Sequence, residues 1–233
     1  MTQLGIVTGL AFEAAILNQQ LKKFEPGQAR PKIWIAGADM ARAGLGARDL
    51  IQNGATALMS FGIAGGLDPA LAPGELVIAT SIIGANGDSI TADTNWASRL
   101  IRLVENDCRV INANLAGYDT AIATAAEKAE MFHATGAVAV DMESLAVALA
   151  AQENGIPFCA VRAIADPAQR EFPGWVPGAV SSEGKIRPLA VLSALIGRSG
   201  PKGNLALLAR DSRAAKATLG RVALVGAPGF GLV

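Results

Sequence analysis

The stretch ALMSFGIAGG at residues 57–66 joins a short apolar run to a glycine-rich end. An apolar run of this length, bounded by glycines, predicts a strand over 57–63 that is buried on both faces, as in parallel sheets. Ala64, Gly65 and Gly66 then leave the end of the strand almost without side chains, so a flat ligand can approach the backbone closely. Because ligands of open α/β sheets collect at the carboxyl ends of strands, this strand end is the first candidate for a site.

Short apolar runs alternate with segments of helical period along most of the chain. The expected strands cover 4–8, 32–36, 57–63, 75–83, 119–124, 136–140 and 157–164. The expected helices cover 11–23, a segment through 49–52 that follows Gly44 and Gly46, 93–105, 125–134, 143–153, 185–196 and 204–219. This alternation predicts an α/β fold with one domain over 1–233: a three-layer α/β/α sandwich around a central mixed, mostly parallel sheet.

The core of this domain is expected over about 4–166. The remaining residues, 167–233, are expected to form a loop and C-terminal helices. The Pro- and Gly-rich part at 167–184 is either a pocket wall or lid, or a surface excursion packed on those helices. The tail at 226–233 is expected to be frayed.

Composition excludes several classes of protein. Twenty basic and twenty acidic side chains cancel, which argues against a nucleic-acid partner. No apolar run reaches the ~18–20 residues of a membrane span, and the N-terminus lacks a secretory pattern. Cys108 and Cys159 lie too far apart in the chain to form a metal-binding motif. We therefore expect a cytoplasmic protein with reduced thiols. A single histidine, His133, leaves little material for catalytic triads or histidine-rich metal sites, and no metal or organic cofactor is expected.

Four polar residues stand where a strand meets the next segment, or inside a strand: Glu13, Glu143, Arg162 and Asp166. Taken singly, the three carboxylates have structural explanations, because acids complement helix N-termini and aspartate before proline suits a turn. Arg162 interrupts an apolar strand, and a guanidinium there requires a carboxylate partner. As a set at one edge of the sheet, the four residues predict a functional site.

Four segments resemble the nucleoside phosphorylase and nucleosidase superfamily, in the family's order. They are GIVTGLAFE at 5–13, GIAGGL at 62–67, VDMES at 140–144 and VRAIAD at 161–166. Residues 60–73, 141–144 and 207–215 are most similar to the bacterial hopanoid-associated phosphorylases, which are linked to removing adenine from adenosylhopane. The resemblance implies cleavage of the N-glycosidic bond of a purine nucleoside, with phosphate as a co-substrate, in a homo-oligomer.

The resemblance also implies roles for the site residues. Asp166 would be the general acid at N7 of the purine, and Glu13 and Arg162 would position the attacking water or phosphate. Glu143 would accept hydrogen bonds from the ribose 2′ and 3′ hydroxyls, because a carboxylate can accept two bonds at once. The remaining expected contacts with the nucleoside are a packing contact of Met142 with the sugar and close approach at Ala64 and Gly65.

The sequence departs from the family at three positions. Ala165 stands where nucleosidases commonly carry a serine that orients the acid. Ser60 and Ile63 stand where hexameric phosphorylases place an arginine and a serine that grip phosphate, and Ile63 cannot bond an oxyanion. Phosphate would then depend on Arg42 and Arg48, whose alternative role is a solvated helix start.

Two alternatives to phosphorolysis stay open: hydrolysis by water, and non-catalytic nucleoside binding on the same fold. The aromatic side chain that stacks on the base is also open, with Phe132, Phe158 and Trp175 as candidates. The segment 171–180 carries Phe172 and Trp175 and could admit a bulky apolar group at the ribose 5′ side.

Overall fold

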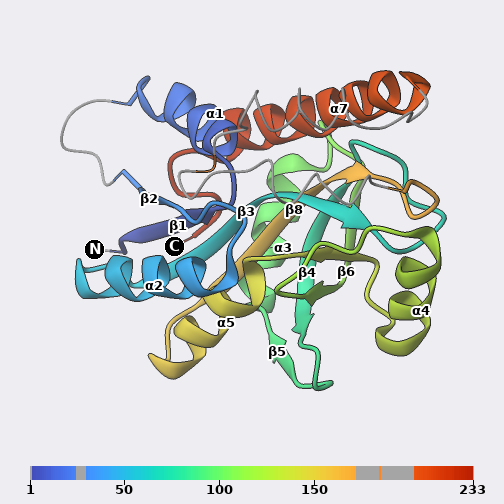
Figure 1. Cartoon of the computed structure of the whole chain (residues 1–233). Helices are drawn as coiled ribbons and strands as arrows, with labels where there is room; N and C mark the ends of the chain where they lie inside the picture. The colour runs from blue at the N-terminus through green and yellow to red at the C-terminus, as the bar shows by residue number, and fades with distance from the viewer. Residues whose placement is uncertain (1, 25–29, 172–183, 185–201, 233) are drawn as a thin grey trace.

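The computed structural model describes residues 2–24, 30–171, 184 and 202–232. Its strands are β1 (Leu4–Thr8), β2 (Lys32–Ile35), β3 (Ala57–Gly66), β4 (Leu76–Ile83), β5 (Ser89–Thr91), β6 (Val110–Gly117), β7 (Ala139–Asp141) and β8 (Phe158–Asp166). Its helices are α1 (Ala11–Leu21), α2 (Met40–Gln52), α3 (Thr94–Val104), α4 (Ala125–Thr135), α5 (Ser144–Glu153) and α7 (Lys202–Gly226). These elements form one α/β unit around a central mixed sheet (Figure 1), as the sequence predicts.

The sheet is mostly parallel, since five of its eight strand pairings are parallel. β3 lies at its centre and pairs with β1, β7 and β8. β8 also pairs with β4, β4 with β6, and β6 with β7, which returns to the end of β3. These pairings close part of the sheet into a ring of five strands, and β1, β2 and β5 extend from it.

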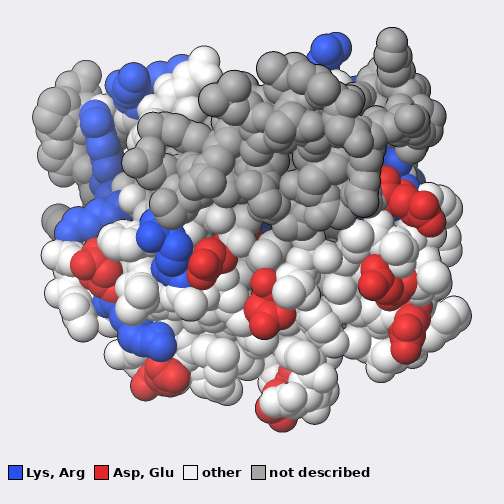
Figure 2. Space-filling model, in the orientation of Figure 1, with Lys and Arg blue, Asp and Glu red and all other residues white. Residues whose placement is uncertain are grey.

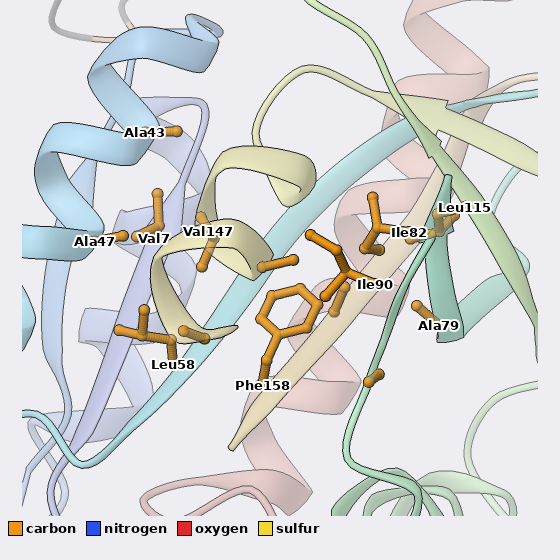
Figure 3. Close-up of a cluster of buried hydrophobic side chains, with 14 of the residues drawn as sticks. Val7, Ala43, Ala47, Leu58, Ala79, Ile82, Ile90, Leu115, Val147 and Phe158 are labelled. Carbon is orange, nitrogen blue, oxygen red and sulfur yellow. The ribbon is translucent and has the colours of Figure 1, made fainter. Parts of the chain in front are cut away.

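Helices cover the sheet on both faces. On one face α2 and α5 lie side by side and bury a cluster that includes Val7, Ala47, Leu58, Val147 and Phe158 (Figure 3). On the opposite face α1, α3 and α7 cover a second cluster, and α1 runs against α7 (Figure 1). Successive residues of β1 therefore pack into different clusters, Ile6 into the second and Val7 into the first, because successive side chains of a strand point to opposite faces.

The strand expected at 119–124 is not present, and the strand at this place in the chain is β6, eight residues long. The two asparagines in the β6 sequence, VINANLAG, interrupt the apolar pattern by which a buried strand is predicted. Both are accommodated in the sheet: Asn112 donates to the Ile78 carbonyl at 2.9 Å, and Asn114 accepts from the Thr80 hydroxyl at 2.6 Å. Residues 119–124 form bends and coil beyond the end of β6.

Helix α2 begins earlier than expected and contains both glycines. Asp39 caps it by accepting from the Arg42 amide at 2.9 Å, a common way to satisfy a free N–H at a helix start. Gly46 lies against Trp34, and a Cβ at Gly46 would overlap the indole ring. The glycine therefore serves close packing of α2 on β2.

The C-terminal helix α7 is longer than the expected 204–219, and the tail after it is not frayed. The Phe230 side chain is fully buried and meets Phe61 edge-on with ring centroids 6.2 Å apart. The Trp96 indole N–H also donates to the Phe230 carbonyl at 2.7 Å. The expected helix at 185–196 and residues 172–183 of the expected loop or wall at 167–184 lie outside the described residues.

The surface carries charges of both signs. Figure 2 shows acidic and basic side chains interspersed over the described part of one face, with broad uncharged areas between them. Within the described ranges, no helix has both the length and the apolar character needed to cross a bilayer.

Candidate active site

A pocket of about 210 Å³ lies at the ends of β1, β3, β7 and β8. Four carboxylates line it: Glu13, Asp141, Glu143 and Asp166. The other lining residues are uncharged and mostly apolar: Gly9, Leu10, Ala38, Ile63, Ala64, Gly65, Thr120, Ala121, Ile122, Ala123, Val140 and Met142. The strand ends that were expected to carry a site therefore meet at one cavity.

Glu13 connects the start of α1 to β3. Its Oε2 accepts from the Leu10 amide at 2.8 Å, as a carboxylate in the first helical turn often does. Its Oε1 accepts from the Ile63 amide at 2.9 Å, fifty residues away in the chain. Burial raises the pKa of Glu13, although the Arg162 charge and these hydrogen bonds oppose the rise. Glu13 thus caps its helix and also lines the pocket.

Arg162 is fully buried in β8 and bonded to several side chains. Its Nε donates to Asp141 at 2.8 Å, and its Nη2 donates to Ser60 at 2.5 Å, Ser144 at 3.1 Å and Glu143 at 3.2 Å. Burial alone would lower the pKa of Arg162, but Asp141, Glu143 and Glu13 outweigh it and raise the pKa above its ordinary value. The guanidinium therefore stays charged and holds the carboxylates in place.

The remaining nitrogen of Arg162, Nη1, is buried and has no hydrogen-bond partner among the described residues. A Cβ placed on Gly62 would overlap this nitrogen and would lie 2.6 Å from Oε1 of Glu13. Arg162 and Glu13 therefore approach the same space over the backbone of β3, and only glycine leaves that space open.

Glu143 precedes α5 and is held against the turn after β1. A Cβ on Gly9 would lie 2.5 Å from Oε1 of Glu143, so this glycine makes room for the carboxylate. Burial raises the pKa of Glu143 to about 8; the Arg162 charge opposes the rise, and the nearby acids Asp141 and Glu13 add to it. Three carboxylates thus surround one guanidinium, and this cluster carries an excess of acid.

Asp166 ends β8 on the other side of the pocket. Its carboxylate lies over Gly65, where an added Cβ would be 3.2 Å from Oδ2. The same oxygen forms an ion pair with Lys128, which is fully buried in α4. Burial raises the pKa of Asp166 to about 7, and the Lys128 charge opposes this rise. A carboxyl group with a pKa near neutrality can exist in its acid form at working pH.

The pocket brings together the residues that the sequence marked for catalysis and substrate binding, except that Arg162 lies behind its lining. Arg42 and Arg48 do not line it: Arg42 donates from Nε to the Ala36 carbonyl at 2.8 Å, and Arg48 is exposed on α2. Phe158 points into the apolar core (Figure 3), so it cannot stack on a ligand in this pocket. Trp175 lies outside the described residues.

Sequence reasoning missed two residues of the site, Asp141 and Lys128. Asp141 holds Arg162 and caps α5 by accepting from the amides of Glu143 and Ser144 at 2.8 and 2.7 Å. Its only signal was a second acid in the DMES segment. Lys128 gave no comparable signal, because a lysine in a helix is usually exposed; only the structure shows that it is buried together with Met131, one turn away in α4.

Residues 3–197 of the chain match the Phosphorylase superfamily. The chain belongs to this superfamily. Comparison with curated protein sequences gave no significant match.

Solved structures of similar fold include several nucleosidases. A putative methylthioadenosine nucleosidase from Weissella paramesenteroides is 20% identical, with 97% of this chain and 98% of that chain covered and a TM-score of 0.66. The 5′-methylthioadenosine/S-adenosylhomocysteine nucleosidase from Neisseria meningitidis, in complex with methylthio-immucillin-A, is 16% identical, with 97% and 98% covered and a TM-score of 0.72. Futalosine hydrolase from Helicobacter pylori is 16% identical, with 95% and 97% covered and a TM-score of 0.70. At these identities the likeness establishes the shared fold.

Proposed function

We propose that this protein cleaves the N-glycosidic bond of a purine nucleoside, with an adenine nucleoside as the expected substrate. The observation that carries the proposal is the meeting of Asp166 with Glu13 and Glu143 in one pocket of a phosphorylase-superfamily chain. The nucleosidases of similar fold support the same reaction class.

The geometry suits a reaction in which the base leaves before the nucleophile has fully bonded. Asp166 in its acid form protonates N7, the C1′–N9 bond breaks, and its electron pair goes to the base. The ribose becomes oxocarbenium-like, and Glu143 accepts hydrogen bonds from its 2′ and 3′ hydroxyls. The carboxyl oxygens around Arg162 are held in place before the reaction, and such preorganised oxygens can stabilise that developing positive charge.

Water is the nucleophile that this pocket favours over phosphate. Among the described lining residues there are four carboxyl groups and no lysine or arginine, so a phosphate dianion would find no cation among them to pair with. Glu13 can take a proton from water over Gly62, where Nη1 of Arg162 also lies. The added hydroxyl then completes the sugar as a free hemiacetal. Phosphorolysis is the second candidate, and it would need a source of positive charge other than Arg42 and Arg48, which do not line the pocket.

The apolar lining also bears on the substrate. Apart from its acids, the pocket offers few hydrogen-bonding side chains, because much of its lining is apolar: Ile63, Ala121, Ile122 and Val140. This suits a nucleoside whose 5′ substituent is apolar, and adenosylhopane is the bulkiest candidate that the family resemblance suggests. Equal rates on adenosine, methylthioadenosine and adenosylhopane would contradict a preference for such a group.

The decisive experiment incubates the protein with a panel of purine nucleosides, with and without phosphate, and separates the released bases by chromatography. Release that is independent of phosphate supports hydrolysis, whereas strict phosphate dependence would establish the phosphorylase reaction.

Asp166→Ala separates an enzyme from a binding protein. The enzyme requires a loss of turnover of about 10²–10⁴-fold, with nucleoside binding retained. If the wild-type protein releases no base from any nucleoside but binds one of them, the chain is a nucleoside-binding protein.

A further inference from the structure

Lys128 is a buried cation next to the proposed general acid. It lies in α4, on the helix face that also carries Met131, and its side chain has no exposed surface. Its ammonium pairs with Oδ2 of Asp166 and donates to the carbonyls of Pro167 at 3.2 Å and Arg170 at 3.0 Å. The described acceptors all belong to the segment 166–170, which carries the acid.

We propose that Lys128 is the positioning residue of Asp166: it holds one carboxyl oxygen from behind the pocket and leaves the other for the purine. This inference rests on the proposed function, in which Asp166 protonates the base. Asp166 lines the pocket and Lys128 does not, so the ammonium reaches the carboxylate from the side away from the ligand. Without such a contact, the carboxyl group could rotate about its side-chain bonds.

Neither residue next to Asp166 in the chain has a group that can hold its carboxyl group in place. The residue before Asp166 is Ala165, which has no hydrogen-bonding group, and the residue after it is Pro167, which has no backbone N–H. The orientation of the acid must therefore come from another element. Lys128 supplies it from α4, and Arg170 fixes the far end of the same segment through an ion pair with Asp211 of α7 at 2.8 Å.

The Lys128 ammonium is buried, so its contact with Asp166 must offset the loss of hydration. Moving a charge out of water costs several kcal/mol unless it is paired and hydrogen-bonded. Lysine offers three N–H donors, and the segment 166–170 offers a carboxylate and two carbonyls to receive them. Burial is the larger influence on the pKa of Asp166, and the same cation opposes it and so keeps the pKa from rising further.

The test compares Lys128→Met, which removes the charge, with Lys128→Arg, which keeps it, and with Glu130→Gln as a control on the exposed side of α4. The first readout is the pH profile of kcat/KM for base release. The second is the titration of the Asp166 carboxyl carbon by ¹³C NMR, assigned with Asp166→Asn.

For Lys128→Met we expect the basic limb and the carboxyl titration to move upward by about 1–3 pH units, because a nearby opposite charge lowers a carboxyl pKa by that amount. We also expect kcat to fall at least tenfold while KM changes less than threefold. Lys128→Arg should restore most of the shift, and Glu130→Gln should behave as wild type. A merely structural lysine would leave kcat of the folded Lys128→Met protein within threefold of wild type, and that result, or unmoved pH readouts, would overturn the inference.

Two further outcomes are distinguishable. If wild type releases no base, the proposed function fails, while the NMR titration still decides whether Lys128 controls Asp166. If Lys128→Met does not fold by circular dichroism, Lys128→Gln replaces it, since it also removes the charge but keeps a hydrogen-bond donor. An unshifted titration in Lys128→Gln would again overturn the inference.

Discussion

Two buried cations flank the pocket, and their surroundings differ. Arg162 of β8 faces Asp141, Glu143 and Glu13, so acids outnumber the cation. Among the described residues, Lys128 of α4 meets the carboxyl group of Asp166 and two backbone carbonyls. In the first group, the Arg162 cluster, several carboxyl groups surround one cation; in the second, the Lys128 pair, the cation holds the carboxyl group of the proposed acid.

The difference indicates that the two sides of the pocket have different roles in the proposed reaction. Carboxyl oxygens fixed around a site favour a ligand that becomes positive, as a ribose does when its base leaves. A carboxyl group with a pKa of about 7 favours proton transfer near neutrality. The sugar therefore belongs on the side of the Arg162 cluster and the base on the side of the Lys128 pair.

Breaking the Arg162 cluster should have the largest effect. Arg162→Met leaves three buried carboxylates without their cation, and breaking a buried pair in this way costs about 3–5 kcal/mol. We expect that loss in the free energy of unfolding measured by urea denaturation, together with loss of base release. A loss below 1 kcal/mol would show that the cluster does not depend on its cation.

The glycines on the two sides offer a matched comparison. Gly62→Ala places a Cβ against Arg162 and 2.6 Å from Glu13, and such overpacking costs about 1–3 kcal/mol. Gly65→Ala places a Cβ 3.2 Å from Asp166, which a shift of a few tenths of an ångström can accommodate. Gly62→Ala should therefore lower the free energy of unfolding more than Gly65→Ala, and the reverse order would contradict the geometry.

The pH dependence of base release should report Asp166. The acid must be protonated to act, and its pKa is raised to about 7, so kcat/KM should be high below pH 7 and fall about tenfold per unit above it. Asp166→Asn cannot lose this proton, and its residual activity should lack that limb. A wild-type limb near pH 4 would mean that burial does not control the acid.

The smallest effect is expected at the surface, where Arg109 pairs with Glu75 at 2.5 Å. The Arg109 side chain is 75% exposed and that of Glu75 only 10%; water screens the arginine charge, and ion pairs with such an exposed partner contribute about 0–1 kcal/mol. Arg109→Met should therefore change the urea midpoint very little and leave base release intact. A larger loss than that of Arg162→Met would overturn the contrast between buried and exposed pairs.

The candidate site was predictable to the extent that its residues stand at strand ends. Glu13, Glu143 and Asp166 each follow an apolar run, and Arg162 interrupts one; the structure brings all four together. Asp141 and Lys128 were missed because each resembles an ordinary polar residue next to a turn or in a helix. Their importance comes from partners 21 and 38 residues away in the chain.

The sequence by itself determined most strands and helices and the edge of the sheet that carries the polar residues, because hydrophobic period and turn-forming residues are local properties. It did not reveal β6, whose asparagines are satisfied only by β4, nor the packed tail, whose Phe230 is buried against α3 and β3. Only the tertiary structure decided that five strands close into a ring and that each buried cation meets its carboxylate. Those pairings depend on distances between remote segments, and no local pattern in the chain encodes such distances.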